Sequence, residues 1–144
     1  QRHQHKKVWP LEYYIQLAQQ LVHYDQNIKI ILTGSQSEQY IAKLFLKKMP
    51  DAVSLIGKTA LLELAALMDQ LQLMITHDTG TMHVACARRT PLITMFAATP
   101  VSFTGPFPQN DRNIILQAEK IEAISVDSVY ANAVQQLKRH QALL

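Results

Sequence analysis

Residues 71–87 read LQLMITHDTGTMHVACA: an apolar run, a short polar turn and a second apolar run. The first run, residues 71–76, is typical of a buried strand, and the second, residues 82–87, is typical of a helix. A strand that turns directly into a helix presents free backbone N–H groups and the positive end of the helix dipole. Because such a turn suits an anion, this stretch predicts a binding site for a phosphate or diphosphate.

Helices and strands alternate along the rest of the chain. Apolar spacing after Pro10 predicts a helix over residues 11–24, and the apolar run that follows predicts a buried strand over 28–33. The other expected helices cover residues 37–49, 60–70 and 126–144, and the other expected strands cover 52–56, 91–96 and 113–117. This alternation, with strands that are continuously apolar, predicts an α/β fold: a Rossmann-like parallel sheet with helices on both faces.

Four loops are expected to meet at one edge of that sheet. Gly34, Gly57, Asp78 and Ala97 each follow an expected strand. Ligands of such sheets bind at the carboxyl ends of the strands, so one cleft could collect all four loops. Because the sequence shows no internal repeat and no linker, we expect residues 1–144 to form a single domain.

The composition excludes several classes of protein. The chain has 144 residues, 48% apolar and 17% charged, which is ordinary for a globular domain. Its single cysteine excludes a disulfide framework and a cysteine zinc site, and fits a reducing, cytoplasmic compartment. A net charge of +3 without a dense basic stripe argues against nucleic acid as a partner. No apolar run reaches the roughly 18 residues that a bilayer span needs.

Two nucleotide-binding motifs are incomplete. Gly57-Lys58-Thr59 resembles the end of a P-loop, but the required glycine five residues earlier is replaced by Ala52. The sequence also lacks Gly-x-Gly-x-x-Gly, which argues against a dinucleotide-dependent oxidoreductase.

Five blocks, in order along the chain, carry a family resemblance. They are Lys7-Val8-Trp9-Pro10; Thr33-Gly34-Ser35 with Glu38; Gly57-Lys58-Thr59 with Leu61-Glu63-Leu64-Ala65; Asp78-Thr79-Gly80-Thr81-Met82-His83-Val84-Ala85; and residues 91–96 with Thr99-Pro100 and Gly105-Pro106. Together they resemble glycosyltransferase family 9, the bacterial heptosyltransferases of lipopolysaccharide core assembly. The likeness covers nearly the whole chain. One departure is Ala97-Ala98, where the family usually has a glycine.

The resemblance implies the C-terminal, donor-binding half of a GT-B glycosyltransferase. An N-terminal domain, absent from this chain, would hold the lipid-linked acceptor and the catalytic base, so this chain alone should bind donor without turning it over. The implied reaction is inverting transfer of heptose from ADP-heptose to the lipopolysaccharide inner core, with possible peripheral contact to the inner membrane. The alternatives are a non-catalytic or degenerate nucleotide-sugar-binding module, a related transferase that uses another sugar nucleotide, and a scaffold for protein association.

The central turn supplies most of the expected donor-binding residues. The backbone N–H groups of Thr79, Gly80 and Thr81 would face the diphosphate, and glycine lets the backbone approach closely. Asp78 would accept hydrogen bonds from sugar hydroxyls, or alternatively cap a helix that begins near Thr81. The resemblance implies that His83, in the first helical turn, contacts phosphate or sugar.

Other loops supply the remaining candidates. Lys7 would stabilise the charge of the leaving nucleoside diphosphate. Glu38 would bind a ribose hydroxyl, or alternatively complement a helix dipole. Thr59 would contact the nucleoside, or cap a helix beginning at Ala60. We expect His77 to pack or bond locally and Trp9 to pack the first helix on the sheet. The sequence shows no aspartate pattern for a metal, and we expect no metal or cofactor.

Overall fold

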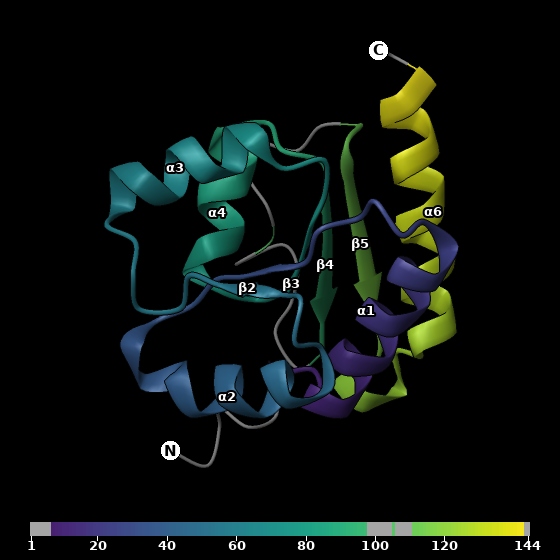
Figure 1. Ribbon diagram of the computed structural model, residues 1–144. Coiled ribbons are helices and arrows are strands. Elements are labelled where there is room, and N and C mark those ends of the chain that lie inside the picture. The colour runs from purple at the N-terminus through teal and green to yellow at the C-terminus, as the bar shows by residue number, and fades with distance from the viewer. Residues whose placement is uncertain (1–6, 98–104, 106–110, 143–144) are drawn as a thin grey trace.

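The chain folds into alternating helices and strands (Figure 1). A computed structural model describes residues 7–97, 105 and 111–142. In chain order the elements are α1 (Leu11–Tyr24), β1 (Ile31–Leu32), the 3₁₀ turn η2 (Gln36–Glu38), α2 (Gln39–Lys48), β2 (Val53–Ser54), α3 (Leu61–Gln70), β3 (Met74–His77), α4 (Gly80–Ala87), β4 (Leu92–Phe96), β5 (Asn113–Gln117), the 3₁₀ turn η3 (Ile121–Ala123) and α6 (Val126–Ala142).

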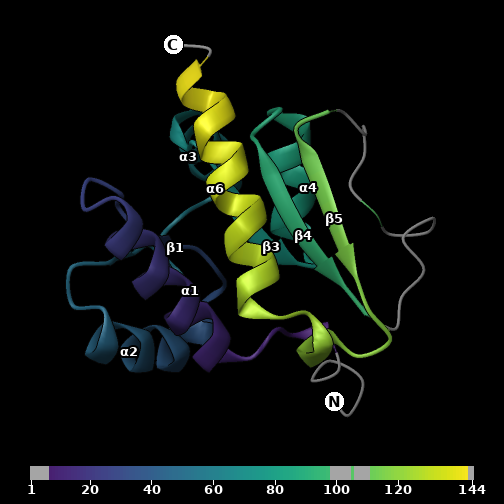
Figure 2. The ribbon, with the colours of Figure 1, turned by 90° about the vertical axis from the view of Figure 1, so that its right-hand side faces the viewer.

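The strands form two parallel sheets flanked by helices. β1 pairs with β2, and β3, β4 and β5 form a second sheet in that order. Figure 2 shows α6 on one face of the second sheet and α4 on the other. Because every strand pair is parallel and helices cover both faces, the α/β, Rossmann-like fold class expected from the sequence is confirmed.

Strand β4 lies at the centre of the hydrophobic core. All five of its residues are buried. Ile93 and Met95 pack with α1 and α6, whereas Leu92 and Phe96 pack with α3 and α4 on the opposite face. Side chains of a strand alternate between faces, so one apolar strand here serves two separate core clusters.

Trp9, just before α1, packs the start of this helix against the core. Its side chain is fully buried, and its indole N–H donates a hydrogen bond to the carbonyl oxygen of Ile124 at 2.9 Å. The Trp9 ring also meets the Tyr13 and Tyr14 rings edge-to-face, with centroids 5.5 and 4.8 Å apart. The expected packing of Trp9 between the first helix and the rest of the fold is confirmed.

The region around β1 departs most from expectation. The strands expected over residues 28–33 and 52–56 are reduced to two residues each, and neither residue of β1 is fully buried. The expected single sheet is therefore divided, because β1 and β3 do not pair. The helix expected over 37–49 opens as the 3₁₀ turn η2 and becomes α-helical only at Gln39.

The bounds of the other helices and strands lie closer to those expected from the sequence. The helix expected over 11–24 and the strand expected over 113–117 have the expected bounds. The strand expected over 71–76 runs instead from Met74 to His77. Ser125 caps α6 by accepting a hydrogen bond from the Ser128 N–H at 3.1 Å. No helix in the described part of the chain is long and apolar enough to cross a membrane.

Candidate functional site

The turn between β3 and α4 has the predicted form. β3 ends at His77 and α4 begins at Gly80, so only Asp78 and Thr79 separate the strand from the helix. The N-cap residue is Thr79 rather than Asp78, and the helix begins one residue before the expected Thr81. The N–H groups of a first helical turn have no acceptor within the helix, so this turn presents donors and a positive dipole end.

Lys7 lies beside this turn. Its Nζ is 3.6 Å from Oδ2 of Asp78, and the two side chains are 41% and 13% exposed. The Asp78 side chain is largely buried, but the Lys7 side chain is open to water, and ion pairs open to solvent contribute little, about 0–1 kcal/mol. What matters here is where the pair places the ammonium group. The pair places an ammonium group next to a helix N-terminus, and both attract an anion.

Gly80 is not required by the fold. It is exposed, and a Cβ built on it would meet no described atom within 4 Å. Thr81 is partly buried, and His83 is exposed on the first turn of the same helix. The glycine therefore leaves open space outside the helix N-terminus, which is where a phosphate would bind.

The Glu38 carboxylate is hydrogen-bonded to the loop after β1. Its Oε2 accepts hydrogen bonds from the Ser35 N–H at 2.7 Å and from the Ser35 hydroxyl at 3.1 Å. A Cβ on Gly34 would lie 2.6 Å from the same oxygen, so a larger residue there would displace the Glu38 carboxylate from its present position. The carboxylate thus closes a capping box at η2. Its expected contact with a ribose hydroxyl stays a prediction.

Thr59 is not a helix cap. The N-cap of α3 is Ala60, and the helix begins at Leu61, so the capping alternative was wrong by one residue. The preceding loop is held close to the loop after β1, since the Gly57 N–H donates to the Gly34 carbonyl at 2.9 Å. Gly57 has a positive φ of 70°, which favours glycine.

Sequence reasoning missed a contact between Tyr14 and His77. The Tyr14 hydroxyl lies 2.9 Å from Nδ1 of His77, although the residues are 63 positions apart. Burial lowers the pKa of His77 below its ordinary 6.5, against the opposing charges of Glu38 and Asp78, and burial also raises the pKa of Tyr14. Both shifts favour the neutral forms of the two side chains. A hydrogen-bonded pair of a neutral imidazole and a neutral phenol therefore adjoins the turn at Asp78. Nothing local in the sequence signals the pair.

Two cavities in the described part of the chain are candidate binding sites. The larger, about 710 Å³, is bounded by α1, β1 and β3, and Gly34, Glu38, His77 and residues 79–81 lie on its wall. The expected convergence of the loops is thus confirmed for Gly34 and for the turn before α4. Three of the expected loop residues, Gly57, Asp78 and Ala97, do not line this cavity, and neither does Thr59.

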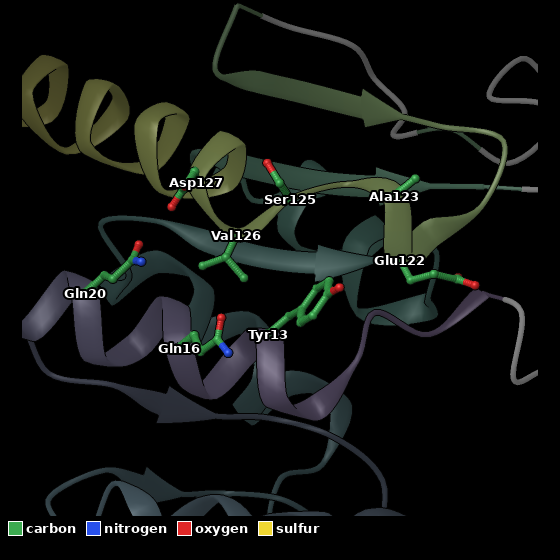
Figure 3. Close-up of a pocket in the computed structure, with 8 residues that line it drawn as sticks. All are labelled: Tyr13, Gln16, Gln20, Glu122, Ala123, Ser125, Val126 and Asp127. Atoms are coloured by element: carbon green, nitrogen blue, oxygen red, sulfur yellow. The ribbon is translucent and has the colours of Figure 1, made fainter.

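The smaller cavity, about 280 Å³, lies between α1 and the start of α6 (Figure 3). Two carboxylates, Glu122 and Asp127, line it together with Gln16 and Gln20, and none of the described residues in its wall is a lysine or an arginine. This charge pattern disfavours a phosphate. The larger cavity, next to Lys7 and the N-terminus of α4, is therefore the candidate site for an anion.

In the described part of the chain, no three His, Cys, Asp or Glu side chains lie close enough to hold a metal ion. The turn expected at Thr99-Pro100, and with it Ala98 and Pro106, lies outside the described residues.

Comparison with known families gives a match over residues 2–133, to the model of glycosyltransferase family 9 (heptosyltransferase). The chain belongs to glycosyltransferase family 9. Lipooligosaccharide heptosyltransferase 2 of Haemophilus influenzae is 30% identical over 125 residues, 83% of this chain and 35% of the relative. Lipopolysaccharide heptosyltransferase 2 of Escherichia coli is 30% identical over 115 residues, 76% of this chain and 32% of the relative. The family-9 chain thus spans about a third of these relatives.

Solved structures agree on the fold. The E. coli ADP-heptose lipopolysaccharide heptosyltransferase II aligns with a TM-score of 0.83 at 23% identity, over 94% of this chain and 44% of that one. E. coli heptosyltransferase WaaC with ADP aligns with a TM-score of 0.80 at 22% identity, over 91% and 40%. The α/β fold of one half of a GT-B glycosyltransferase is thereby confirmed for this family-9 chain.

Proposed function

We propose that this chain is the donor-binding domain of a heptosyltransferase and holds the diphosphate of a nucleotide sugar at residues 78–81. One observation carries the proposal. Lys7 and the N-terminus of α4 meet at the Asp78 turn, beside a cavity of about 710 Å³. A cation and a set of free N–H groups at the carboxyl end of a parallel strand are what a diphosphate requires.

The same groups would assist transfer. As the glycosidic bond to the diphosphate breaks, negative charge accumulates on the leaving phosphate oxygens. An ammonium group and a helix N-terminus fixed beside those oxygens stabilise the transition state more than the ground state. Lys7, with 41% of its side chain exposed, has the freedom to shift from Asp78 to a phosphate.

The other candidate residues would each contact one part of the donor. Asp78 would accept hydrogen bonds from the sugar hydroxyls, away from the phosphates, and His83 would contact phosphate or sugar from the exposed side of α4. Glu38, already bonded to Ser35, would use its other carboxylate oxygen for the ribose, and Thr59 would contact the nucleoside. None of these steps needs a metal or cofactor.

The proposal for the whole enzyme extends further. Residues 1–144 would act as one donor-binding domain, and a separate acceptor domain would carry the base that activates a hydroxyl of the lipid-linked inner core. Direct attack on the anomeric carbon would invert its configuration and release ADP. The choice of ADP-heptose rests on the names of similar proteins, such as E. coli heptosyltransferase WaaC with ADP. The enzyme would work in the cytoplasm, in peripheral contact with the inner membrane.

Calorimetric titration with ADP, UDP and GDP tests the proposal. We expect selective ADP binding that Gly80→Ala weakens at least tenfold, because the added methyl fills the space outside the helix N-terminus. The same substitution should leave the fold intact, since no described atom lies within 4 Å of the new methyl and alanine favours helix by about 0.5–1 kcal/mol.

Two further variants complete the experiment. Lys7→Met should weaken ADP binding about tenfold or more, which corresponds to the roughly 1.5–3 kcal/mol of a charged hydrogen bond. Gln16→Ala, in the smaller cavity, is the matched control and should bind like the parent chain. Equal ADP affinity in the parent, Gly80→Ala and Lys7→Met proteins would refute the proposed site.

A further inference from the structure

Two contacts join the start of α1 to the end of β3. The outer contact is the ion pair of Lys7 with Asp78, in which Nζ and Oδ2 are 3.6 Å apart and the lysine side chain is open to water. The inner contact is the hydrogen bond of Tyr14 with His77, in which the hydroxyl and Nδ1 are 2.9 Å apart and partly buried. A hydrogen bond weakens steeply with distance and angle, whereas an ion pair in water tolerates a range of separations. The inner contact is therefore the one that can fix the spacing of the two segments.

Both partners of the inner contact pack against fully buried residues. The Tyr14 ring meets the Trp9 ring edge-to-face, with centroids 4.8 Å apart, and Trp9 is fully buried. In β3, His77 lies in register with Met95 of β4, which is also fully buried. The inner contact thus joins the base of α1 to the end of β3, although its two residues are 63 positions apart in the chain.

The chain leads from each partner directly into the candidate site. Asp78 follows His77, and Lys7 comes two residues before Trp9, against which the tyrosine packs. Val8, between Lys7 and Trp9, is exposed. An exposed segment has few contacts of its own, so its position follows that of the packed residues next to it. A change at the inner contact would therefore move Lys7 relative to the Asp78 turn.

Charged groups of the candidate site act on the inner contact. Burial lowers the pKa of His77, and the carboxylates of Glu38 and Asp78 oppose this shift. Burial also raises the pKa of Tyr14, and the charge of Glu38 raises it further. Tyr14, His77 and Glu38 all line the larger cavity. The inner contact therefore lies close to both loops of the candidate site, the Glu38 loop and the Asp78 turn.

We propose that Tyr14 and His77 are positioning residues of the donor site, and that the hydrogen bond between them sets the distance at which Lys7 faces the turn at residues 78–81. This inference rests on the proposed donor site and adds two residues that act through Lys7. Without the tyrosine hydroxyl, Nδ1 of His77 loses its partner, and the base of α1 can shift against the end of β3. A shift of about 1 Å is enough to take the Lys7 ammonium out of hydrogen-bond range of a phosphate oxygen.

A purely structural role makes a different prediction. If the Tyr14–His77 pair only stabilised the fold, its loss would lower the melting temperature and leave the ADP affinity of the folded chain unchanged. If the pair positions Lys7, its loss weakens ADP binding only while the lysine is present. A double-mutant cycle between Tyr14 and Lys7 separates the two roles.

Calorimetric titration of ADP into four folded chains performs this cycle: the parent, Tyr14→Phe, Lys7→Met and the double variant. We expect Tyr14→Phe to weaken ADP binding about fivefold or more in the parent background. In the Lys7→Met background the same substitution should change the affinity by less than about twofold. Tyr13→Phe is the matched control, because Tyr13 also meets the Trp9 ring, with centroids 5.5 Å apart, but lines the smaller cavity. It should bind ADP like the parent chain.

Two substitutions of His77 test the other partner of the hydrogen bond. In His77→Asn the side-chain amide can replace Nδ1 as the partner of the Tyr14 hydroxyl, so the ADP affinity should stay near that of the parent. His77→Leu has no hydrogen-bonding group and should weaken ADP binding as much as Tyr14→Phe does. Equal losses in the asparagine and leucine variants would overturn the proposal, because they would show that the imidazole itself is needed.

NMR of the ligand-free chain gives a readout that does not depend on a nucleotide. Through-space contacts between the Lys7 and Asp78 side chains should be present in the parent and lost in Tyr14→Phe, while contacts between Ile75 and Ile93 verify that β3 and β4 stay paired. Retention of the Lys7–Asp78 contacts in Tyr14→Phe would overturn the proposal, as would an unchanged ADP affinity or an equally large loss in the Lys7→Met background. If even the parent binds no ADP, the donor-site proposal fails, and the Lys7–Asp78 contacts alone decide whether Tyr14 positions Lys7.

Discussion

The sheet β3–β4–β5 and the pair β1–β2 are both parallel, but only the first contains a fully buried strand. Every residue of β4 is buried, and its two faces join separate core clusters. Between residues 28 and 56, the segment that contains β1, α2 and β2, the fully buried residues are Ala42, Phe45 and Ile56, and none belongs to either cluster. The difference shows that complete burial goes with pairing on both edges, because β4 has a strand on each side whereas β1, β2, β3 and β5 each pair with one strand in the described part of the chain.

The candidate site lies on the border between these regions. The N-terminus of α4 is anchored in the well-packed half, since Met82, Ala85 and Cys86 are buried in one of its clusters. The Gly34–Glu38 loop belongs to the weakly packed half. Local stability follows burial, so we expect the diphosphate end of the site to be rigid and the opposite loop to adapt on binding.

The largest change in stability is expected when a buried side chain of β4, in the well-packed half, is shortened. Ile93→Ala removes a fully buried side chain and should lower the free energy of unfolding by about 2–5 kcal/mol in urea denaturation. The matched variant Ile31→Ala, in β1, where both residues are only partly buried, should cost less, about 1 kcal/mol. If the two substitutions lowered the free energy of unfolding equally, the two regions would not differ in how much their packing stabilises the fold.

A smaller effect is expected at the anchor of α1. Trp9→Phe removes the indole donor of the 2.9 Å hydrogen bond to Ile124 and leaves a carbonyl without its partner. We expect a loss of about 1–3 kcal/mol in the free energy of unfolding. Tyr24→Phe, at the exposed end of the same helix, serves as the control and should change stability little. If Trp9→Phe is neutral, α1 is held by its apolar contacts alone.

The Tyr14–His77 pair should make stability depend on pH. Burial lowers the pKa of His77 in the folded chain, so the unfolded chain binds the proton more tightly. The stabilising contribution is therefore complete above about pH 6.5 and is lost as the pH falls toward the folded pKa, at no more than about 1.4 kcal/mol per pH unit. Thermal melts from pH 7.5 to 5 should show a steeper decline for the parent than for His77→Asn. Parallel declines would mean that His77 does not titrate differently on unfolding.

The smallest effect is expected at an exposed ion pair on the surface of the well-packed half, between α3 and the end of α4. Arg88 makes two hydrogen bonds to Asp69, at 2.8 and 2.6 Å, and these lower the carboxyl pKa of Asp69. Arg88→Ala should raise that pKa toward its ordinary value in an NMR titration, with little change in melting temperature. A large loss of stability would show that the α3–α4 contact depends on this pair more than on Met68 and its neighbours.

Local patterns predicted the elements that depend on local chemistry. Pro10 and the apolar spacing after it specify the start of α1, and the polar turn at Asp78 specifies the break between β3 and α4. The division of the sheet was not predictable, because the length of β1 depends on which strand lies beside it. The bond from Tyr14 to His77 was missed for the same reason, since it joins residues brought together only by the fold.

Side-chain roles were harder to predict than positions. Lys7 and Asp78 were each expected at the site, and the structure places Nζ of Lys7 3.6 Å from Oδ2 of Asp78, while their roles toward a donor stay predictions. The bonds from Ser35 to Glu38 were not expected, because a glutamate three residues after a serine suits both a capping box and a ribose contact. Sequence alone could not choose between these uses.

The central claim is that the turn at residues 78–81, together with Lys7, binds a nucleoside diphosphate. Titration of ADP into the isotopically labelled chain, followed by two-dimensional NMR, tests it most directly. The account predicts that the largest amide shifts occur at Gly80, Thr81 and His83, with smaller ones at Ser35, and that Gln16 and Glu122 in the smaller cavity stay unchanged. Shifts confined to the smaller cavity, or no shifts at all in a folded chain at millimolar ADP, would contradict it.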